Sequence, residues 1–325
     1  MSDFYSGKRV LLTGGAGFIG SHVAEMLVAR GARVTIPLRS STKTDFLSHI
    51  LDRVAVVEAD LCDRSQVDTV MKGQEIVLNL AASKGGGIAH SMTHHGTLFR
   101  ENMELFLPVL DSARVTEVER FLVVSSACIY SRETNDHAVE SNGFQGVPET
   151  ANAGYGWAKR MEEYLGQAYA EEFGMKIAIA RAYNSYGPRD AYFSTYSHVI
   201  PSLIRRIFGG ENPLIVWGTG TQTRSFLYAT DFARGVLDVC EKYAVADPLN
   251  IGSDEEISIG DLARLLIELS GKDVKVEFDT TKPDGPLRRS ADTTKAFEKI
   301  GYRAEVPLRE GLKNCIEWYQ AHKPQ

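Results

Sequence analysis

Short apolar runs alternate with longer amphipathic stretches through the first half of the chain. The apolar runs, which predict buried strands, lie at 10–12, 34–36, 54–57, 76–80, 121–124 and 177–180. The amphipathic stretches, which predict helices, lie at 18–30, 63–72, 97–115 (with a kink expected at Pro108) and 155–173, ending at Gly174. Strands that are apolar throughout and alternate with helices indicate an α/β fold with a parallel sheet covered on both faces.

The alternation breaks down after about residue 185, where loops, short helices and charged turns dominate. The run 249–251 is strand-like, and we expect it to return to the main sheet. We therefore predict that 1–184 together with 226–252 form one domain. Residues 185–225 and 253–325 would form a smaller α/β lobe interleaved with it.

Composition narrows the class of protein. The chain has 325 residues, 43% of them hydrophobic, and a formal net charge of −6. This charge argues against a nucleic-acid or polybasic membrane surface. Four scattered cysteines without a CxxC pair argue against structural zinc and a disulfide framework, so we expect no metal. A polar N-terminus and the lack of an apolar run of about 18 residues predict no signal peptide, no membrane span and a cytoplasmic location.

A glycine-rich segment, VLLTGGAGFIGSHV, joins the first predicted strand to the first helix. Gly14, Gly17 and Gly20 have GxxGxxG spacing and flank Phe18 and Ile19. Such glycines permit a tight turn, a close approach of backbone to a pyrophosphate, and close packing of helix on strand. An ordinary glycine-rich turn is the other interpretation, but the strand–turn–helix context favours dinucleotide binding in a Rossmann, doubly wound sheet.

The end of the second predicted strand bears on the choice of cofactor. NAD sites usually place a carboxylate there, whereas this chain has Arg39 and Ser40 and no carboxylate before Asp45. A guanidinium with adjacent hydroxyls suits the 2′-phosphate of NADP(H), and a solvated arginine beside tightly bound NAD is the alternative. Asp60 and Leu61, after the third strand, are expected to cover the adenine.

The segment YGWAK places Tyr155 and Lys159 four residues apart, on one face of a helix. A phenol that exchanges a proton with a sugar carbonyl benefits from a nearby ammonium, which lowers its pKa. The pattern alone is common by chance. It becomes specific together with the glycine loop and with Ser126, a hydroxyl at the end of a predicted strand.

With these motifs the chain resembles, from about residue 8 to 320, the extended short-chain dehydrogenase/reductase superfamily of nucleotide-sugar enzymes. The resemblance implies that Ser126, Tyr155 and Lys159 form the catalytic set. It also implies a homodimer, and that RAYNSYGPRD (181–190) touches both nicotinamide and substrate. The further cofactor-binding residues expected on this basis are Ala81, Ala82 and Asn184.

The segment SSACIY (125–130) is similar to that of two groups in the superfamily, the GDP-L-fucose synthases and the GDP-mannose 3,5-epimerases. In both, the residue matching Cys128 is one half of an acid–base pair, and a thiol tuned by a nearby cation can serve near neutral pH. The segment SHVIPSLIRR (197–206) resembles the synthases, which makes His198 the other half. The substrate-binding residues implied are Lys84, Gly86, Asn184, Arg206, Trp217, Arg224, Lys282 and Asp284.

The resemblance implies an NADPH-dependent epimerase/reductase that acts on a nucleotide-diphosphate 4-keto-6-deoxy-hexose, expected to be GDP-linked. A redox-neutral epimerase with tightly held NAD is the alternative, and a catalytically silent NADP sensor is a weaker one. Ser131 after CIY departs from both groups, and a set of histidines, His90, His94 and His95, departs from the synthase pattern. We interpret these histidines as surface or substrate-loop residues, because no carboxylate or thiol completes a metal site.

Overall fold

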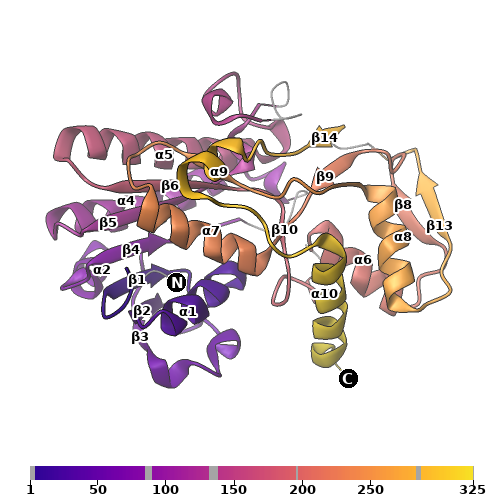
Figure 1. The fold of residues 1–325 in the computed structure, drawn as a ribbon, viewed down its shortest axis with the longest axis horizontal. Helices are drawn as coiled ribbons and strands as arrows, with labels where there is room; N and C mark the ends of the chain where they lie inside the picture. The colour runs from indigo at the N-terminus through magenta and orange to yellow at the C-terminus, as the bar shows by residue number, and fades with distance from the viewer. Residues whose placement is uncertain (1–3, 85–89, 132–137, 195–196, 283–286, 325) are drawn as a thin grey trace.

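The computed structural model describes residues 4–84, 90–131, 138–194, 197–282 and 287–324. In these ranges a seven-stranded parallel sheet, in the order β11-β6-β5-β4-β1-β2-β3, forms the centre of the larger lobe (Figure 1). The strands are β1 (Arg9–Thr13), β2 (Arg33–Leu38), β3 (Val54–Glu58), β4 (Ile76–Asn79), β5 (Arg120–Ser126), β6 (Ile177–Ala182) and β11 (Leu249–Ile251). The predicted α/β class and parallel sheet are confirmed, as is the return of 249–251 to the sheet beside β6.

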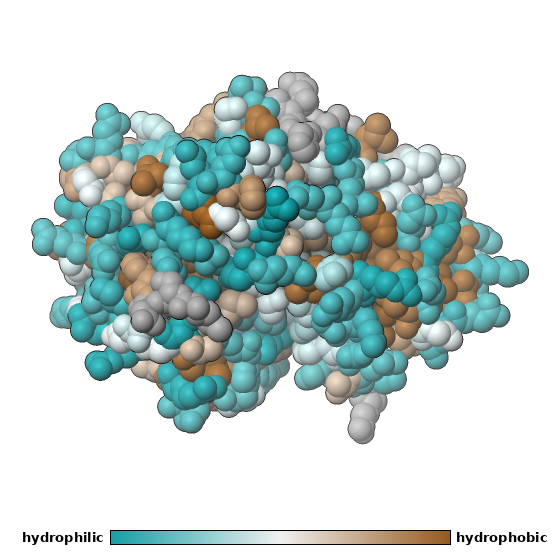
Figure 2. Space-filling view, viewed as in Figure 1, coloured by the Kyte–Doolittle hydropathy of each residue, from teal (hydrophilic) through white to brown (hydrophobic). Residues whose placement is uncertain are grey.

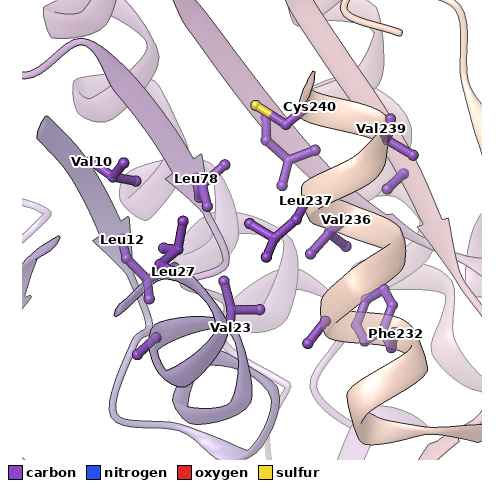
Figure 3. Close-up of a cluster of buried hydrophobic side chains, with 14 of the residues drawn as sticks. Val10, Leu12, Val23, Leu27, Leu78, Phe232, Val236, Leu237, Val239 and Cys240 are labelled. Carbon is purple, nitrogen blue, oxygen red and sulfur yellow. The ribbon is translucent and has the colours of Figure 1, made fainter. Parts of the chain in front are cut away.

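Helices cover both faces of this sheet. One face packs against α1 (Phe18–Ala29) and α7 (Ala229–Lys242), and the other against α2 (Arg64–Met71), α4 (His95–Val115) and α5 (Ala153–Phe173). Successive strand residues point to opposite faces, so Val10 and Leu12 belong to the first core and Leu11 to the second. Figure 3 shows Val10 and Leu12 facing the apolar sides of α1 and α7.

The predicted helices agree with this architecture. Helix α4 continues through Pro108 as one segment of 21 residues. Helix α5 ends at Gly174, whose φ of 68° is the left-handed conformation that glycine adopts at little cost.

The smaller lobe is built from the later part of the chain and has a hydrophobic core of its own (Figure 1). Its helices are α6 (Val199–Phe208), α8 (Ile259–Ser270) and α10 (Leu308–His322), while α9 (Thr294–Ile300) packs beside β11. Its short strands are β8 (Leu214–Trp217) with β13 (Val276–Asp279), and β9 (Thr223–Ser225) between β12 (Glu256–Ser258) and β14 (Arg288–Arg289). A further pair, β7 (Ser185–Tyr186) with β10 (Leu227–Tyr228), follows β6 and precedes α7.

Hydrophilic side chains cover most of the face seen in Figure 2, and hydrophobic ones gather on it around α8. Within the described ranges, no helix combines the length and apolar character that crossing a membrane requires. Because the strands are parallel, their carboxyl ends meet at one edge of the sheet, which is where open α/β sheets bind their ligands. The segments after β1 to β6 therefore define the candidate site.

Candidate active site

The turn after β1 brings backbone atoms unusually close together. Gly14 has a φ of +68°, and a Cβ atom there would lie 2.9 Å from the backbone nitrogen of Ala81. A Cβ atom at Gly20 would lie 2.1 Å from the carbonyl oxygen of Gly14, so α1 packs directly on the turn. Gly17 is the N-cap of α1 and provides no side chain to occupy the helix start. These residues fit a dinucleotide, whose pyrophosphate would face the N–H groups and positive dipole of α1.

The expected adenosine-binding residues follow the next two strands. Arg39 and Ser40 come directly after β2 and are exposed, so the guanidinium and hydroxyl are open to a ligand. Asp60 follows β3, and its Oδ1 atom accepts a hydrogen bond of 3.0 Å from the backbone of Cys62, while Leu61 is buried. This arrangement orders the loop beneath the place where an adenine would lie.

The expected nicotinamide-binding residues follow β4 and β6. The backbone nitrogen of Ala81 donates to Thr13 Oγ1 at 3.0 Å, which ties this segment to β1; Ala82 comes next and is exposed. Asn184 follows β6, and its Nδ2 atom donates to the carbonyl of Ser225 on β9 at 2.9 Å. Asn184 therefore links the sheet edge to the smaller lobe.

Ser126, Cys128 and Tyr155 meet where β5 ends. Ser126 is the last residue of β5, and its hydroxyl accepts the backbone N–H of Cys128 at 3.2 Å. The same hydroxyl hydrogen-bonds the phenol of Tyr155, which projects from the first turns of α5. The hydroxyl at the end of the strand therefore lies beside a buried thiol and a buried phenol.

Burial dominates the protonation of Tyr155. Burial raises the pKa of Tyr155 to about 12, and Cys128 and Glu162 act in the same direction. Lys159 and the hydrogen bond from Ser126 act to lower it, as the sequence pattern predicts, but do not overcome burial. The phenol is therefore a proton donor at neutral pH, as reduction of a ketone requires.

Lys159 lies beneath the tyrosine ring, with Nζ 5.6 Å from the ring centroid. Its ammonium donates to Glu162 Oε2 at 2.8 Å, and both side chains are about 3% exposed. Burial opposes the charge on Lys159, but the Glu162 carboxylate and Tyr155 outweigh burial and the pKa of the lysine is raised. Glu162 was not predicted, although an acid three residues after Lys159 on a helix is a usable signal.

The Cys128 thiol contacts an arginine that the sequence reasoning did not single out. Nη2 of Arg289, on β14, donates to Cys128 Sγ at 3.4 Å. Nη1 of Arg289 lies 3.1 Å from Glu149 Oε2, a carboxylate on the segment that precedes α5. The only signal in the sequence was the pair of arginines a few residues after the KPDG segment.

His198, at the N-cap of α6, contacts two charged residues. Its Nδ1 atom lies 3.1 Å from Asp190 Oδ1, and its Nε2 atom lies 3.2 Å from Lys84 Nζ. The structure therefore brings the predicted residues Lys84 and His198 together. Asp190, which also contacts His198, was not predicted individually but belongs to the predicted segment 181–190. Within the described ranges, the hydrogen bonds of Cys128 and His198 go to these separate partners.

Two arginines of the smaller lobe lie side by side on neighbouring strands. Arg224 of β9 is in register with Arg289 of β14. Burial lowers the pKa of Arg224 to about 10, and the charge of Arg289 adds to this effect. Arg206, the other predicted arginine, instead pairs with Glu211 and donates to the carbonyl of Ile215. The repulsion between Arg224 and Arg289 would favour an anionic group beside Arg224.

Trp217 at the end of β8 is 61% exposed, and Lys282 Nζ lies 5.9 Å from its ring centroid. An exposed indole beside an ammonium is suited to stacking with a planar aromatic ligand. Two other predicted substrate residues, Gly86 and Asp284, lie outside the described residues.

The unassigned histidines do not form a metal site in the part of the chain that the structure describes. The rings of His90 and His94 stack with centroids 3.9 Å apart, and Gly154 N donates to His95 Nδ1 at 3.4 Å. Within the described ranges, no three or more His, Cys, Asp or Glu residues are grouped so that they could hold a metal.

A Rossmann sheet with a glycine turn and a Ser–Tyr–Lys set defines a class of dinucleotide-dependent enzymes. Residues 10–252 match the NAD dependent epimerase/dehydratase family, and the chain belongs to this family. The family lies within the extended short-chain dehydrogenase/reductases, so the predicted resemblance is confirmed.

Three curated relatives match almost the whole chain. The chain is 31% identical to dTDP-4-dehydro-6-deoxy-D-allose reductase of Streptomyces bikiniensis, with 99% of each chain covered. It is 31% identical to probable GDP-L-fucose synthase 1 of Oryza sativa subsp. japonica, over 96% of this chain and 92% of the relative. It is 30% identical to GDP-mannose 3,5-epimerase 1 of the same plant, over 95% and 81%.

A solved epimerase from Methanothermobacter thermautotrophicus has the same fold. It superposes with a TM-score of 0.88 at 26% sequence identity, covering 98% of this chain and 94% of that one.

Proposed function

We propose that the protein is an NADPH-dependent nucleotide-sugar epimerase/reductase that acts on a nucleotide-diphosphate 4-keto-6-deoxy-hexose. The observation that carries this proposal is the thiol of Cys128, which adjoins the Ser126–Tyr155 pair at the end of β5. Reduction of a ketone needs the hydroxyl and the phenol but not the thiol. A thiol at this place supplies the acid–base group for proton exchange beside the ketone. Two relatives support the choice, a GDP-L-fucose synthase and a reductase whose name specifies a 4-dehydro-6-deoxy sugar.

The residues divide the chemistry among them. Cys128 and His198 exchange protons at the carbons that flank the ketone, each serving as a base or an acid. Ser126 polarises the C4 oxygen, Tyr155 donates the proton that this oxygen gains, and Lys159 supports Tyr155 electrostatically. The turn after β1 and Arg39 would hold NADPH, which would supply the hydride.

The substrate would extend from this site across the smaller lobe. Arg224 would hold the pyrophosphate, because a guanidinium matches phosphate oxygens bidentately. Trp217 and Lys282 would lie against the nucleobase, which we propose to be guanine, and Lys84 beside His198 would face the sugar. The remaining proposed contacts are Asn184, Gly86, Arg206 and Asp284.

A redox-neutral 3,5-epimerase is the second candidate. The 30% identity to GDP-mannose 3,5-epimerase 1 favours it. This epimerase would differ from the proposed reductase in two respects: its cofactor would be a tightly held NAD, and it would consume no reductant.

We also propose a homodimer, formed through α4 and α5. Phe99 and Leu107 on α4, and Trp157 and Tyr164 on α5, are exposed although large and apolar. Their spacings of eight and seven residues place each pair on one side of its helix, and α4 packs alongside α5. A second copy would cover this strip. A cytoplasmic location remains part of the proposal.

The test combines a binding screen with stoichiometry. GDP-, dTDP- and UDP-linked sugars are compared by thermal shift with NADPH present, since a tight ligand stabilises the folded state in proportion to ln(1 + [L]/Kd). The best ligand, in its 4-keto form, is then converted while NADPH is followed at 340 nm. One NADPH consumed per product supports the reductase, and conversion without consumption supports the epimerase. Absence of both binding and conversion for every nucleotide sugar contradicts both.

A further inference from the structure

Arg289 bridges two groups that lie on different parts of the fold. One of its terminal nitrogens donates to Cys128 Sγ at 3.4 Å, and the other lies 3.1 Å from Glu149 Oε2. The three side chains are nearly buried: Cys128 is 7% exposed, and the side chains of Arg289 and Glu149 are 13% and 8% exposed. The guanidinium is thus fixed at both ends and has little freedom to turn away from the sulfur.

Charged and titratable groups from several elements surround the Cys128 thiol. Tyr155 faces it from α5, and Arg289 faces it from β14. Glu149, Tyr183 after β6, and Arg224 on β9 lie close enough to Arg289 to interact with it electrostatically. Although burial opposes its charge, Cys128 and Glu149 raise the pKa of Arg289, so the guanidinium stays protonated.

We propose that Arg289 is a positioning residue, which holds the sulfur of Cys128 as a thiolate ready to accept a proton, and that Glu149 anchors its guanidinium. The proposal deepens the proposed function, because it explains how a buried thiol can act as a base. A cation beside a cysteine favours the thiolate, the form that accepts protons and attacks electrophiles. In the reaction, the carbon–hydrogen bond beside the ketone breaks, its electron pair moves into the enolate, and the proton forms an S–H bond.

Arg289 also offsets the cost of burying a charged sulfur. Burying a thiolate without a partner is strongly unfavourable, since an isolated buried charge loses its hydration. Arg289 offsets that cost, while the carboxylate of Glu149 neutralises part of its charge and holds the guanidinium in place. The neighbouring Arg288 pairs instead with Glu256 at 2.9 Å and is 46% exposed. Arg288 therefore offers a matched control on the same strand.

The test reads the thiol directly and needs neither cofactor nor sugar. Purified full-length protein is alkylated with iodoacetamide at pH 7 and pH 9.5, and the rate at each cysteine is measured by mass spectrometry. For Cys128, the ratio of the rate at pH 7 to that at pH 9.5 should be at least about 10-fold lower in Arg289→Met than in the wild type. The ratio should be unchanged in Arg288→Met, and exposed Cys62 should react alike in all variants.

An unchanged Cys128 ratio in a folded Arg289→Met protein overturns the proposal. If Arg289→Met does not fold, Arg289→Lys is tested in its place. This variant keeps the positive charge but lacks the two terminal nitrogens of the guanidinium. A ratio within threefold of the wild type then supports the proposal, and a ratio as low as that of Cys62 contradicts it. Absence of nucleotide-sugar turnover would refute the proposed function but leave the alkylation result readable, so the two failures are distinguishable.

Discussion

Nδ1 of His198 lies 3.1 Å from Oδ1 of Asp190, whose side chain is only 3% exposed, while Nε2 lies 3.2 Å from the ammonium of Lys84. An acidic partner on one side and a donor on the other assign the ring proton to Nδ1, which leaves Nε2 as an acceptor. A histidine held in this way can accept a proton from a substrate that displaces Lys84.

The pairing predicts a specific effect of Asp190→Asn. The amide can donate to Nδ1, which would favour the other tautomer and block Nε2 as an acceptor. We expect proton exchange into the product in D₂O to fall about 10²- to 10⁴-fold. The thermal shift on nucleotide binding should be unchanged, because the Asp190 carboxylate is engaged by His198 and by the backbone nitrogen of Ala191. Unimpaired exchange in the folded variant would remove His198 from the acid–base pair.

Cys128→Ser separates proton exchange from hydride transfer. The serine hydroxyl is a far weaker acid than a thiol, so it cannot serve as the base near neutral pH. Deuterium incorporation at C3 or C5 should drop about 10²- to 10⁴-fold, while reduction of a substrate that needs no epimerisation changes little. Mass spectrometry of the product and absorbance at 340 nm measure the two steps. Equal loss of both would assign Cys128 a structural role.

Arg39→Ala tests the choice of cofactor. The residue is exposed directly after β2 and should form charge-assisted hydrogen bonds with a 2′-phosphate. Such bonds contribute about 1.5–3 kcal/mol, so KM for NADPH should rise roughly 10- to 100-fold. KM for NADH should stay within about twofold and serves as the internal control. An equal rise for both cofactors, or none, contradicts the NADP assignment.

Arg224→Met tests the pyrophosphate site. Arg224 and Arg289 are adjacent cations whose mutual repulsion an anion would relieve. We expect Kd for GDP, measured by calorimetry, to rise about 10- to 100-fold. Arg206→Met, which removes an arginine paired with Glu211, should weaken the binding of GDP less than Arg224→Met does. The reverse order would place the pyrophosphate beside Arg206.

Tyr155 should stay protonated well above neutral pH, because burial raises its pKa to about 12. Tyrosinate absorbance at 295 nm should therefore rise equally in the wild type and in Tyr155→Phe up to about pH 10. In the reductive direction, the activity attributable to the phenol should persist over the same range, since the protonated form is the donor. Additional wild-type absorbance below pH 9 would show that Lys159 outweighs burial.

Much of the fold and part of the site could be predicted because they depend on local spacing. Glycines three residues apart define one turn, and Tyr155 and Lys159 share a helix face whatever else the chain does. The parallel sheet followed from apolar runs that alternate with amphipathic stretches. The carboxyl ends of its strands then had to meet at one edge, which brought the expected residues 39, 60, 81, 126 and 184 to one side of the sheet.

The sequence by itself therefore determined the class of fold, the cofactor turn and the place of Ser126, because each depends on neighbours a few residues apart. Only the tertiary structure decided what surrounds the thiol and the imidazole. Arg289 reaches Cys128 across 161 positions, and Lys84 reaches His198 across 114. Contacts of that range depend on how β14 pairs with β9 and how the smaller lobe packs on the sheet edge. Local sequence periodicity does not predict these contacts, because they are stabilised by packing throughout the core and not by neighbouring residues in the chain.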